Sequence, residues 1–286
     1  MKKLLFQLDT DSHPSVFDTV VAYDGGADQV IGHGNVTPEN VGTLVDGAIF
    51  TRAPKEKKNT ALFVGGSNMQ AGQAVFEAVK QRFFGGFRVS AMLDSNGSNT
   101  TAAAAVARLM SSGSLAGKRA VVLAGTGPVG QRAAVMLARA GVTDITLTSR
   151  VLARAEAATR DIRSAFSVEV KPVQALNCED RALAIADAEI VLAAGANGVE
   201  LLRPEHWQSL SRLQLLADAN ATPPLGIGGV EVMDRGAERS GKIAWGAIGF
   251  GTLKLALHRA CIAQLFESND LILDAEEIFA IAQTMP

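Results

Sequence analysis

Short apolar runs alternate along the chain with longer segments of helical periodicity. In the first third, Leu4–Leu8, Ala61–Val64 and Arg88–Leu93 are predicted to be strands, bounded by polar or glycine-rich joints. Met69–Phe83 places its apolar residues at helical spacing and is predicted to be a helix. Strands that alternate with helices are typical of a parallel sheet.

The same alternation continues more regularly after Gly117. The predicted strands of this part are Ala120–Ala124, Ile145–Thr148, Val168–Val173, Ile190–Ala194 and Leu215–Ala217. The predicted helices are Thr101–Met110 (capped by Asn99 or Thr100), Val129–Ala140, Leu152–Phe166, Cys178–Ala186, Thr252–Phe266 and Ala275–Ala282. We therefore predict an α/β protein with a first domain over residues 1–98 and a second over residues 99–286, whose C-terminal helices pack back on the first.

A glycine-rich loop follows the strand Ala120–Ala124 directly and leads into a predicted helix. Its residues are Gly125, Thr126, Gly127, Pro128, Val129 and Gly130. In such a strand–loop–helix unit the glycines allow a tight turn, close approach of a pyrophosphate, and close packing of the helix on the strand. The helix N-terminus adds unpaired N–H groups that favour an anion. We therefore predict a Rossmann-type domain and assign these residues, with Ala194 and Gly195 after a later strand, to a dinucleotide cofactor.

The end of the next predicted strand bears on which dinucleotide is bound. An NAD enzyme usually carries Asp or Glu there, to hold the ribose 2′-hydroxyl. This chain instead has Ser149 and Arg150, with Arg154 one helical turn further on. Guanidinium groups bind phosphate well, so NADP is the expected cofactor. The alternative is that both arginines are solvated cations at the start of a helix.

Composition and charge exclude several other classes of protein. The chain has 286 residues, 48% hydrophobic and 20% charged, with a net charge of −2, so neither nucleic acid nor an anionic membrane is expected as a partner. No apolar run is long enough to span a membrane, and the one after Met1 is too short for a signal peptide, so a cytoplasmic protein is expected. The two cysteines suggest neither a disulfide framework nor a metal site.

No familiar acid–base or nucleophilic motif is visible. The four histidines are scattered, and a lone histidine is more often structural than catalytic. No zinc or carboxylate-rich metal motif occurs, so no metal is expected. Chemistry that needs a metal ion or a strong general base is therefore hard to place on this chain.

Several segments are more distinctive than a generic cofactor-binding sequence. They are Ser15–Asp28, Gly34–Val41, Phe87–Ala104, Lys118–Gly130, Ala217–Glu231 and Leu253–Ser268. They include DSNGSNTTAAA and PPLGIGG. In these segments the chain resembles the NADP-dependent methylene-tetrahydromethanopterin dehydrogenases of methylotrophic bacteria.

The resemblance implies an enzyme of one-carbon (formaldehyde) metabolism, with a pterin-binding first domain. Such enzymes reversibly oxidise the methylene bridge of a reduced pterin to a methenyl cation and pass the hydride to NADP⁺. Some also accept methylene-tetrahydrofolate. The product cation is stabilised by its own nitrogens, so alignment and exclusion of water suffice and no general base is needed. The resemblance also implies a metal-free homo-oligomer, a trimer.

A pterin ring presents donors and acceptors that carboxylate and amide side chains can bind. The candidates for substrate binding are Asp18, Asp24, Asp94, Asn96, Thr101 and Asn220, and those for positioning are Asn99, Thr100 and Lys254. Plainer explanations remain open. The Asp94–Thr101 loop could simply cap a helix, Lys254 could be a surface lysine, and Asp18 could be a first-turn helix acid.

Other functions are also weighed. Methylene-tetrahydrofolate could be the main carrier, because it shares the reacting ring system. A non-catalytic NADP(H)-sensing protein would use the same loop. A shikimate-type reductase would need a Lys–Asp pair, but Lys55, Lys57 and Lys58 lie in a charged loop that suggests solvation. Cyclohydrolase activity is not expected, because Tyr23, the only tyrosine, is followed four positions later by Ala27 rather than lysine.

Overall fold

The computed structural model describes residues 1–286 and divides them into two compact units. Unit 1 comprises Met1–Thr100 and Leu255–Pro286, and unit 2 comprises Thr101–Lys254. The chain passes from one unit to the other within two helices, α4 (Ser98–Ser111) and α8 (Ala247–Gln264). None of the helices is long and apolar enough to cross a membrane.

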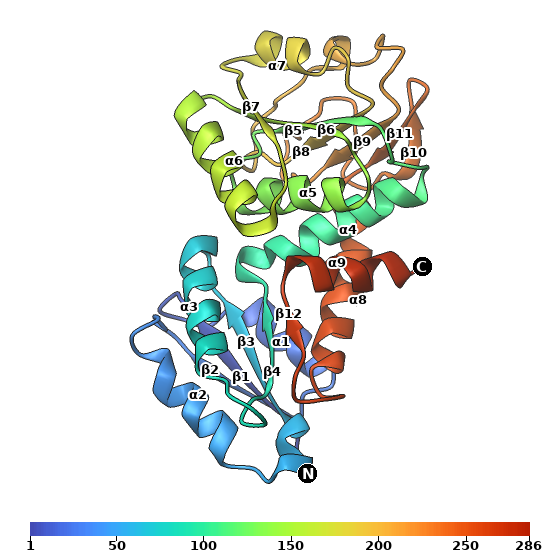
Figure 1. Ribbon diagram of the computed structural model, residues 1–286. Coiled ribbons are helices and arrows are strands. Elements are labelled where there is room, and N and C mark those ends of the chain that lie inside the picture. Colours follow the sequence, from blue (N-terminus) through green and yellow to red (C-terminus); the bar gives the residue numbers. More distant parts are fainter. The chain divides into compact units, whose positions relative to one another are not determined.

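Unit 1 is built on a five-stranded sheet in which all paired strands are parallel (Figure 1). The strand order is β12 (Ile272–Leu273), β4 (Ser90–Leu93), β3 (Thr60–Gly65), β1 (Leu4–Asp9) and β2 (Gln29–His33). The chain leaves β1 to form β2 on one side and then β3 on the other. The strand order therefore reverses between β1 and β3, where open α/β sheets bind their ligands.

Helices cover both faces of this sheet. On one face, α2 (Val41–Phe50) and α3 (Met69–Gln81) pack against alternate residues of the strands, such as Leu62 and Val64. On the other face lie α1 (Val16–Asp24) and α8, whose His258 ring stacks on Phe63 of β3. The unit also contains two short 3₁₀ turns, Pro54–Asn59 and Ser95–Gly97, and the last helix, α9 (Ala275–Thr284).

Unit 2 contains a seven-stranded sheet. The order is β10 (Arg235–Arg239), β11 (Lys242–Trp245), β9 (Leu215–Asp218), β8 (Ile190–Ala193), β5 (Arg119–Leu123), β6 (Asp144–Ser149) and β7 (Lys171–Gln174). Every pair is parallel except β10 with β11. Apart from β10, this is the strand order of dinucleotide-binding domains, and it reverses between β5 and β8.

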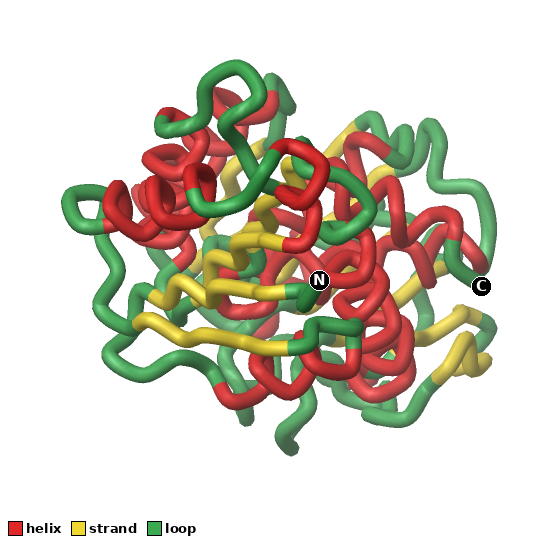
Figure 2. Tube along the Cα trace, turned by 90° about the horizontal axis from the view of Figure 1, so that it is seen from below, coloured by secondary structure: helices red, strands yellow, loops and turns green.

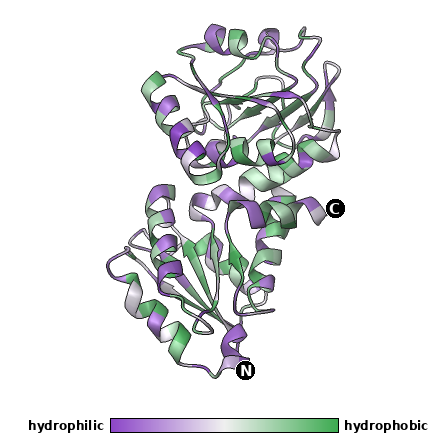
Figure 3. Cartoon of the chain, in the orientation of Figure 1, coloured by the Kyte–Doolittle hydropathy of each residue, from purple (hydrophilic) through white to green (hydrophobic).

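The unit 2 sheet is also covered on both faces. Helices α5 (Pro128–Arg139) and α6 (Leu152–Phe166) pack on β5, β6 and β7. The opposite face carries α7 (Cys178–Ala184), a 3₁₀ turn (Pro204–His206) and the buried Trp207. In each unit, helices and loops flank the strands (Figure 2), and apolar residues concentrate on the strands and on the inward sides of the helices (Figure 3).

The predicted α/β class is confirmed, and most element boundaries are close to those predicted. The strands β2, β10, β11 and β12 were not predicted. β2 and β12 lie at edges of their sheet, and β2 is only partly buried, so its sequence lacks a continuous apolar run. Two helices begin at least three residues earlier than predicted: α4 begins at Ser98 and α8 at Ala247. Gly249 and Gly251, two of the first five residues of α8, concealed that start.

Candidate functional site

The glycine-rich loop of unit 2 lies at the point where the strand order of its sheet reverses. It follows β5 and is held by β6, because the backbone N–H groups of Ala124 and Gly125 donate to the hydroxyl and carbonyl oxygens of Thr148, each at 3.0 Å. A Cβ at Gly130 would lie 2.5 Å from the Cα of Gly125, so only glycine lets α5 begin this close to the loop. No atom lies within 4 Å of a Cβ placed on Gly127, so this side of the loop is open.

The start of α5 is suited to an anion. Its N-cap residue is Gly127, which has no side chain to accept from the first N–H groups, and Pro128 occupies the first turn. The side chain of Gln131 donates to the carbonyl oxygen of Thr126 at 2.8 Å and braces the loop. The residues predicted for the pyrophosphate therefore form an open loop with an uncapped helix N-terminus, as that group requires.

The residues predicted for the 2′-phosphate lie at the end of β6 and the start of α6. Ser149 is buried, and its hydroxyl accepts the N–H of Val151 at 3.2 Å. Arg150 and Arg154 are exposed, and neither guanidinium forms an ion pair within the protein. Both cations are therefore available to an external anion.

The ends of β8 and β9 complete this edge of the unit 2 sheet. Ala194 and Gly195 follow β8 and are half-buried. Asp218 ends β9 and is fully buried, and its carboxylate accepts the N–H groups of Asn220 at 3.0 Å and Ile227 at 2.7 Å. Burial raises the pKa of this carboxyl, and the backbone hydrogen bonds oppose that shift. Asn220 itself is buried and binds the backbone of Thr222 and Pro224, so its side chain shapes this loop.

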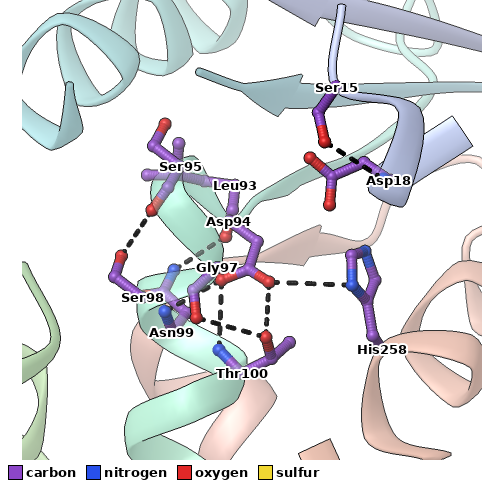
Figure 4. A network of polar contacts seen from close by, with 10 residues as sticks. All are labelled: Ser15, Asp18, Leu93, Asp94, Ser95, Gly97, Ser98, Asn99, Thr100 and His258. Carbon is purple, nitrogen blue, oxygen red and sulfur yellow. Dashed lines mark hydrogen bonds and ion pairs between the residues drawn. The ribbon is translucent and has the colours of Figure 1, made fainter. Parts of the chain in front are cut away.

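In unit 1, Asp94 follows β4 and organises the loop after it (Figure 4). Its Oδ1 accepts the N–H groups of Asn99 at 2.8 Å and Thr100 at 3.1 Å, and its Oδ2 accepts the Thr100 hydroxyl at 2.6 Å. The prediction that Asn99 or Thr100 caps the helix is wrong, because both lie inside α4 and Asp94 binds their N–H groups. Asn99 instead donates to the carbonyl oxygen of Leu93 and to Asp274.

The other residues predicted to bind substrate lie at different depths. Asn96 is exposed, with a left-handed backbone (φ 56°), and Thr101 is half-buried. Asp18 is buried in the first turn of α1, at the same sheet edge as Asp94, and its N–H donates to Ser15. Asp24 lies at the other end of α1 and pairs with Arg259 at 2.7 Å. The structure therefore brings Asp18 and Asp94 to one edge and places Asp24 elsewhere.

Lys254 is half-buried on α8, where it is the last residue of unit 2. No cluster of His, Cys, Asp and Glu side chains suited to a metal ion is found.

The sequence analysis missed a polar group at the reversal point of the unit 1 sheet. Asp9, at the end of β1, is buried and accepts the N–H groups of Asp11 at 2.9 Å and Ser15 at 3.0 Å. Asp11 accepts both the N–H and the hydroxyl of Ser67, each at 2.9 Å, in the loop after β3. The signal in the sequence was Gly65-Gly66 after an apolar strand, with Asp-Thr-Asp after another.

Known proteins match both parts of the chain. Residues 16–96 match a family model described as methylene-tetrahydromethanopterin dehydrogenase, N-terminal. The bifunctional protein MdtA of Methylorubrum extorquens (strain AM1) is 57% identical over 286 residues, with 99% of each chain covered. The chain belongs to the methylene-tetrahydromethanopterin dehydrogenase family.

A second relative from the same organism is described as an NAD(P)-dependent methylenetetrahydromethanopterin dehydrogenase. It is 32% identical over 130 residues, which cover 43% of this chain and 44% of that relative. The structure of shikimate 5-dehydrogenase from Listeria monocytogenes, in complex with shikimate and NAD, matches with a TM-score of 0.55 at 14% identity, over 98% of this chain and 96% of that one. This last likeness shows the fold alone. The family and these sequence relatives support an NAD(P)-dependent dehydrogenase.

Proposed function

We propose that the protein reversibly oxidises the methylene bridge of methylene-tetrahydromethanopterin to the methenyl cation, with NADP⁺ as the hydride acceptor. The observation that carries this proposal is that one chain combines a unit matching the dehydrogenase N-terminal model with a unit that has a dinucleotide-type glycine loop. Unit 1 contains the residues that match the dehydrogenase N-terminal model, and unit 2 contains the glycine-rich loop at the reversal point of its sheet.

The preference for NADP rests on the end of β6. Gly125, Gly127 and the start of α5 would hold the pyrophosphate, and Arg150 and Arg154 would bind the 2′-phosphate from the exposed side. No carboxylate follows β6 at the position where NAD enzymes hold the ribose hydroxyl. Bound NADP⁺ would accept the hydride, and the protein would bind and orient the cofactor.

The substrate side of the proposal rests on the polar loops of unit 1. Asn96 is exposed on the loop that Asp94 organises, Thr101 is half-buried in the first turn of α4 that follows it, and Asp18 lies at the same sheet edge. We propose that these residues, with Lys254, bind and orient the pterin. The reacting carbon gives up a hydride and no proton, so the reaction needs no general base. Asp94 is buried and does not have to act as one.

The test is spectrophotometric. The protein is mixed with NADP⁺ and either methylene-tetrahydromethanopterin or methylene-tetrahydrofolate, and the formation of NADPH is followed. We expect NADPH with the methanopterin carrier, and a smaller kcat/KM with the folate carrier or with NAD⁺. Absence of NADPH with both carriers contradicts the proposal, and a larger kcat/KM with the folate carrier would make folate the main substrate.

If the protein only sensed NADP(H), it would bind NADPH without a response to either carrier. A carrier-dependent rise in the melting temperature of the NADP⁺ complex distinguishes the enzyme from such a sensor.

A further inference from the structure

One buried histidine lies beside the aspartate that organises the loop after β4 (Figure 4). His258 is on α8, and its side chain is 0% exposed. Its ring stacks on Phe63 of β3, with centroids 5.5 Å apart, and lies 6.3 Å from the ring of Phe17 on α1. Its Nδ1 atom is 3.9 Å from Oδ2 of Asp94, which is equally buried. The ring is thus fixed on two sides by aromatic groups while one nitrogen faces the carboxylate.

The buried carboxylate of Asp94 needs compensation for its lost hydration. Part of it comes from the two N–H groups and the hydroxyl that donate to its oxygens. Cys261, one turn further along α8, cannot add a positive charge, and burial and the charge of Asp94 raise the pKa of its thiol, so it stays neutral. His258 is the neighbour that can carry a positive charge against this carboxylate.

Asp218 in unit 2 provides a comparison. It also ends a strand, is fully buried and binds N–H groups of the loop that follows. No ion pair joins its carboxylate to a cation, and burial raises its pKa. The loop after β4 therefore differs from the loop after β9 in having an imidazole beside its central carboxylate.

We propose that His258 is a positioning residue for the carrier: as an imidazolium it holds the Asp94 carboxylate, and Asp94 in turn fixes the loop that carries Asn96. His258 acts through Asp94, and its complete burial keeps it from the substrate. The inference rests on the proposed function, since the loop is taken to bind the pterin. It also predicts a property of the free protein that does not depend on any substrate.

That property is the charge of the ring. In ¹⁵N NMR spectra of the unaltered protein at neutral pH, we expect both nitrogens of His258 to be protonated. A His258→Phe variant identifies the signal by its disappearance. A neutral imidazole at neutral pH overturns the proposal whatever the activity of the protein.

The kinetic test uses His258→Phe, which keeps a ring between Phe63 and Phe17 but removes both nitrogens. We expect KM for the methylene carrier to rise about tenfold, as loss of a charge-assisted contact implies, while Kd for NADPH stays unchanged. His258→Gln, whose amide can donate toward Asp94, should recover part of the loss. The matched control is His206→Phe in unit 2, which should leave both constants unchanged.

A carrier KM in His258→Phe equal to that of the unaltered protein overturns the proposal, as does an equal loss of carrier and NADPH binding. Hydrogen exchange at the N–H groups of Asn99 and Thr100, measured without carrier, should speed up in His258→Phe and not in His206→Phe. Failure of the proposed function would instead appear as no NADPH formation by the unaltered protein, with the NMR and exchange results unaffected. If His258→Phe does not fold, His258→Gln assigns the NMR signal in its place, and the charge of the ring in the unaltered protein decides.

Discussion

Asp9, Asp94 and Asp218 end or directly follow strands β1, β4 and β9, and each turns its buried carboxylate toward the loop that follows. Asp9 and Asp218 both accept the N–H of the residue two positions on, whereas Asp94 reaches N–H groups at the start of α4. A short acidic side chain at a strand end thus replaces backbone pairing where the chain turns away from the sheet. These buried aspartates hold the loops in shape, and the exposed side chains beside them are free of that task and can contact a ligand.

Asp218→Asn tests this role in unit 2. One amide oxygen cannot replace both carboxylate oxygens, and the amide N–H₂ faces a backbone N–H, so we expect a loss of about 1–3 kcal/mol in the free energy of unfolding. Urea denaturation at neutral pH measures it. Asn177→Ala serves as a reference: it removes the N-cap of the short helix α7, and loss of such a cap lowers the free energy of unfolding by about 1 kcal/mol.

The pH dependence of the same variant has a definite sign. Burial raises the pKa of Asp218 in the folded protein above its value of 3.8, so the folded state binds more protons than the unfolded state in that range. The stability that this group contributes is therefore present at low pH and lost as pH rises through the folded pKa. The difference in unfolding free energy between the unaltered protein and Asp218→Asn should shrink as pH rises from about 4. A difference that grows with pH would contradict the assignment.

Arg150→Ala tests the choice of cofactor. If Arg150 binds the 2′-phosphate, about 1.5–3 kcal/mol of charge-assisted binding is at stake, reduced where solvent reaches the pair. We expect Kd for NADPH to rise several-fold or more and Kd for NADH to stay the same, as measured by fluorescence titration. Arg160→Ala, which removes an exposed arginine within α6, is the matched control. An unchanged ratio of the two affinities in Arg150→Ala contradicts NADP binding at this position.

At the scale of elements, the glycine-rich loop Gly125–Gly130 depends on how closely α5 approaches the end of β5. Its N-terminal turn begins against the loop, and the space that a Cβ at Gly130 would need is already filled by the backbone of Gly125. The contact is between backbone atoms, which cannot move aside as a flexible side chain could.

Gly130→Ala should therefore displace the start of α5 or the loop. We expect a lower melting temperature and a loss of NADPH affinity of at least tenfold, which is about 1.4 kcal/mol. Gly47→Ala is the control: it lies inside α2 with open space at its Cβ, and there alanine should leave stability unchanged or raise it by up to about 1 kcal/mol. Normal NADPH binding by Gly130→Ala would show that the loop does not require this packing.

At the scale of the whole molecule, the sequence predicted the fold class and the central strands, because continuous apolar runs such as Ala61–Val64 mark strands buried on both faces. It did not predict the partly buried β2 or the two-residue β12, which lack such runs. The glycine-rich loop could be predicted because its residues are consecutive in the sequence and follow a recognisable strand. The Asp11–Ser67 contact and the Asp94–His258 pair could not, because each joins segments that only the strand order and the placement of α8 bring together. The pterin contacts, the homo-oligomer and the preference for NADP remain predictions.

The return of Leu255–Pro286 to unit 1 has a consequence for synthesis of the chain. Strand β12 pairs with β4, and Asp274 receives hydrogen bonds from Gln73 and Asn99, so residues that follow unit 2 in the chain complete a unit whose other strands precede it. All of unit 2 emerges from the ribosome before that closing segment does. Unit 2 can therefore fold while unit 1 still lacks one edge strand of its sheet, and a chain released before Leu271 would leave that edge open to wrong pairing.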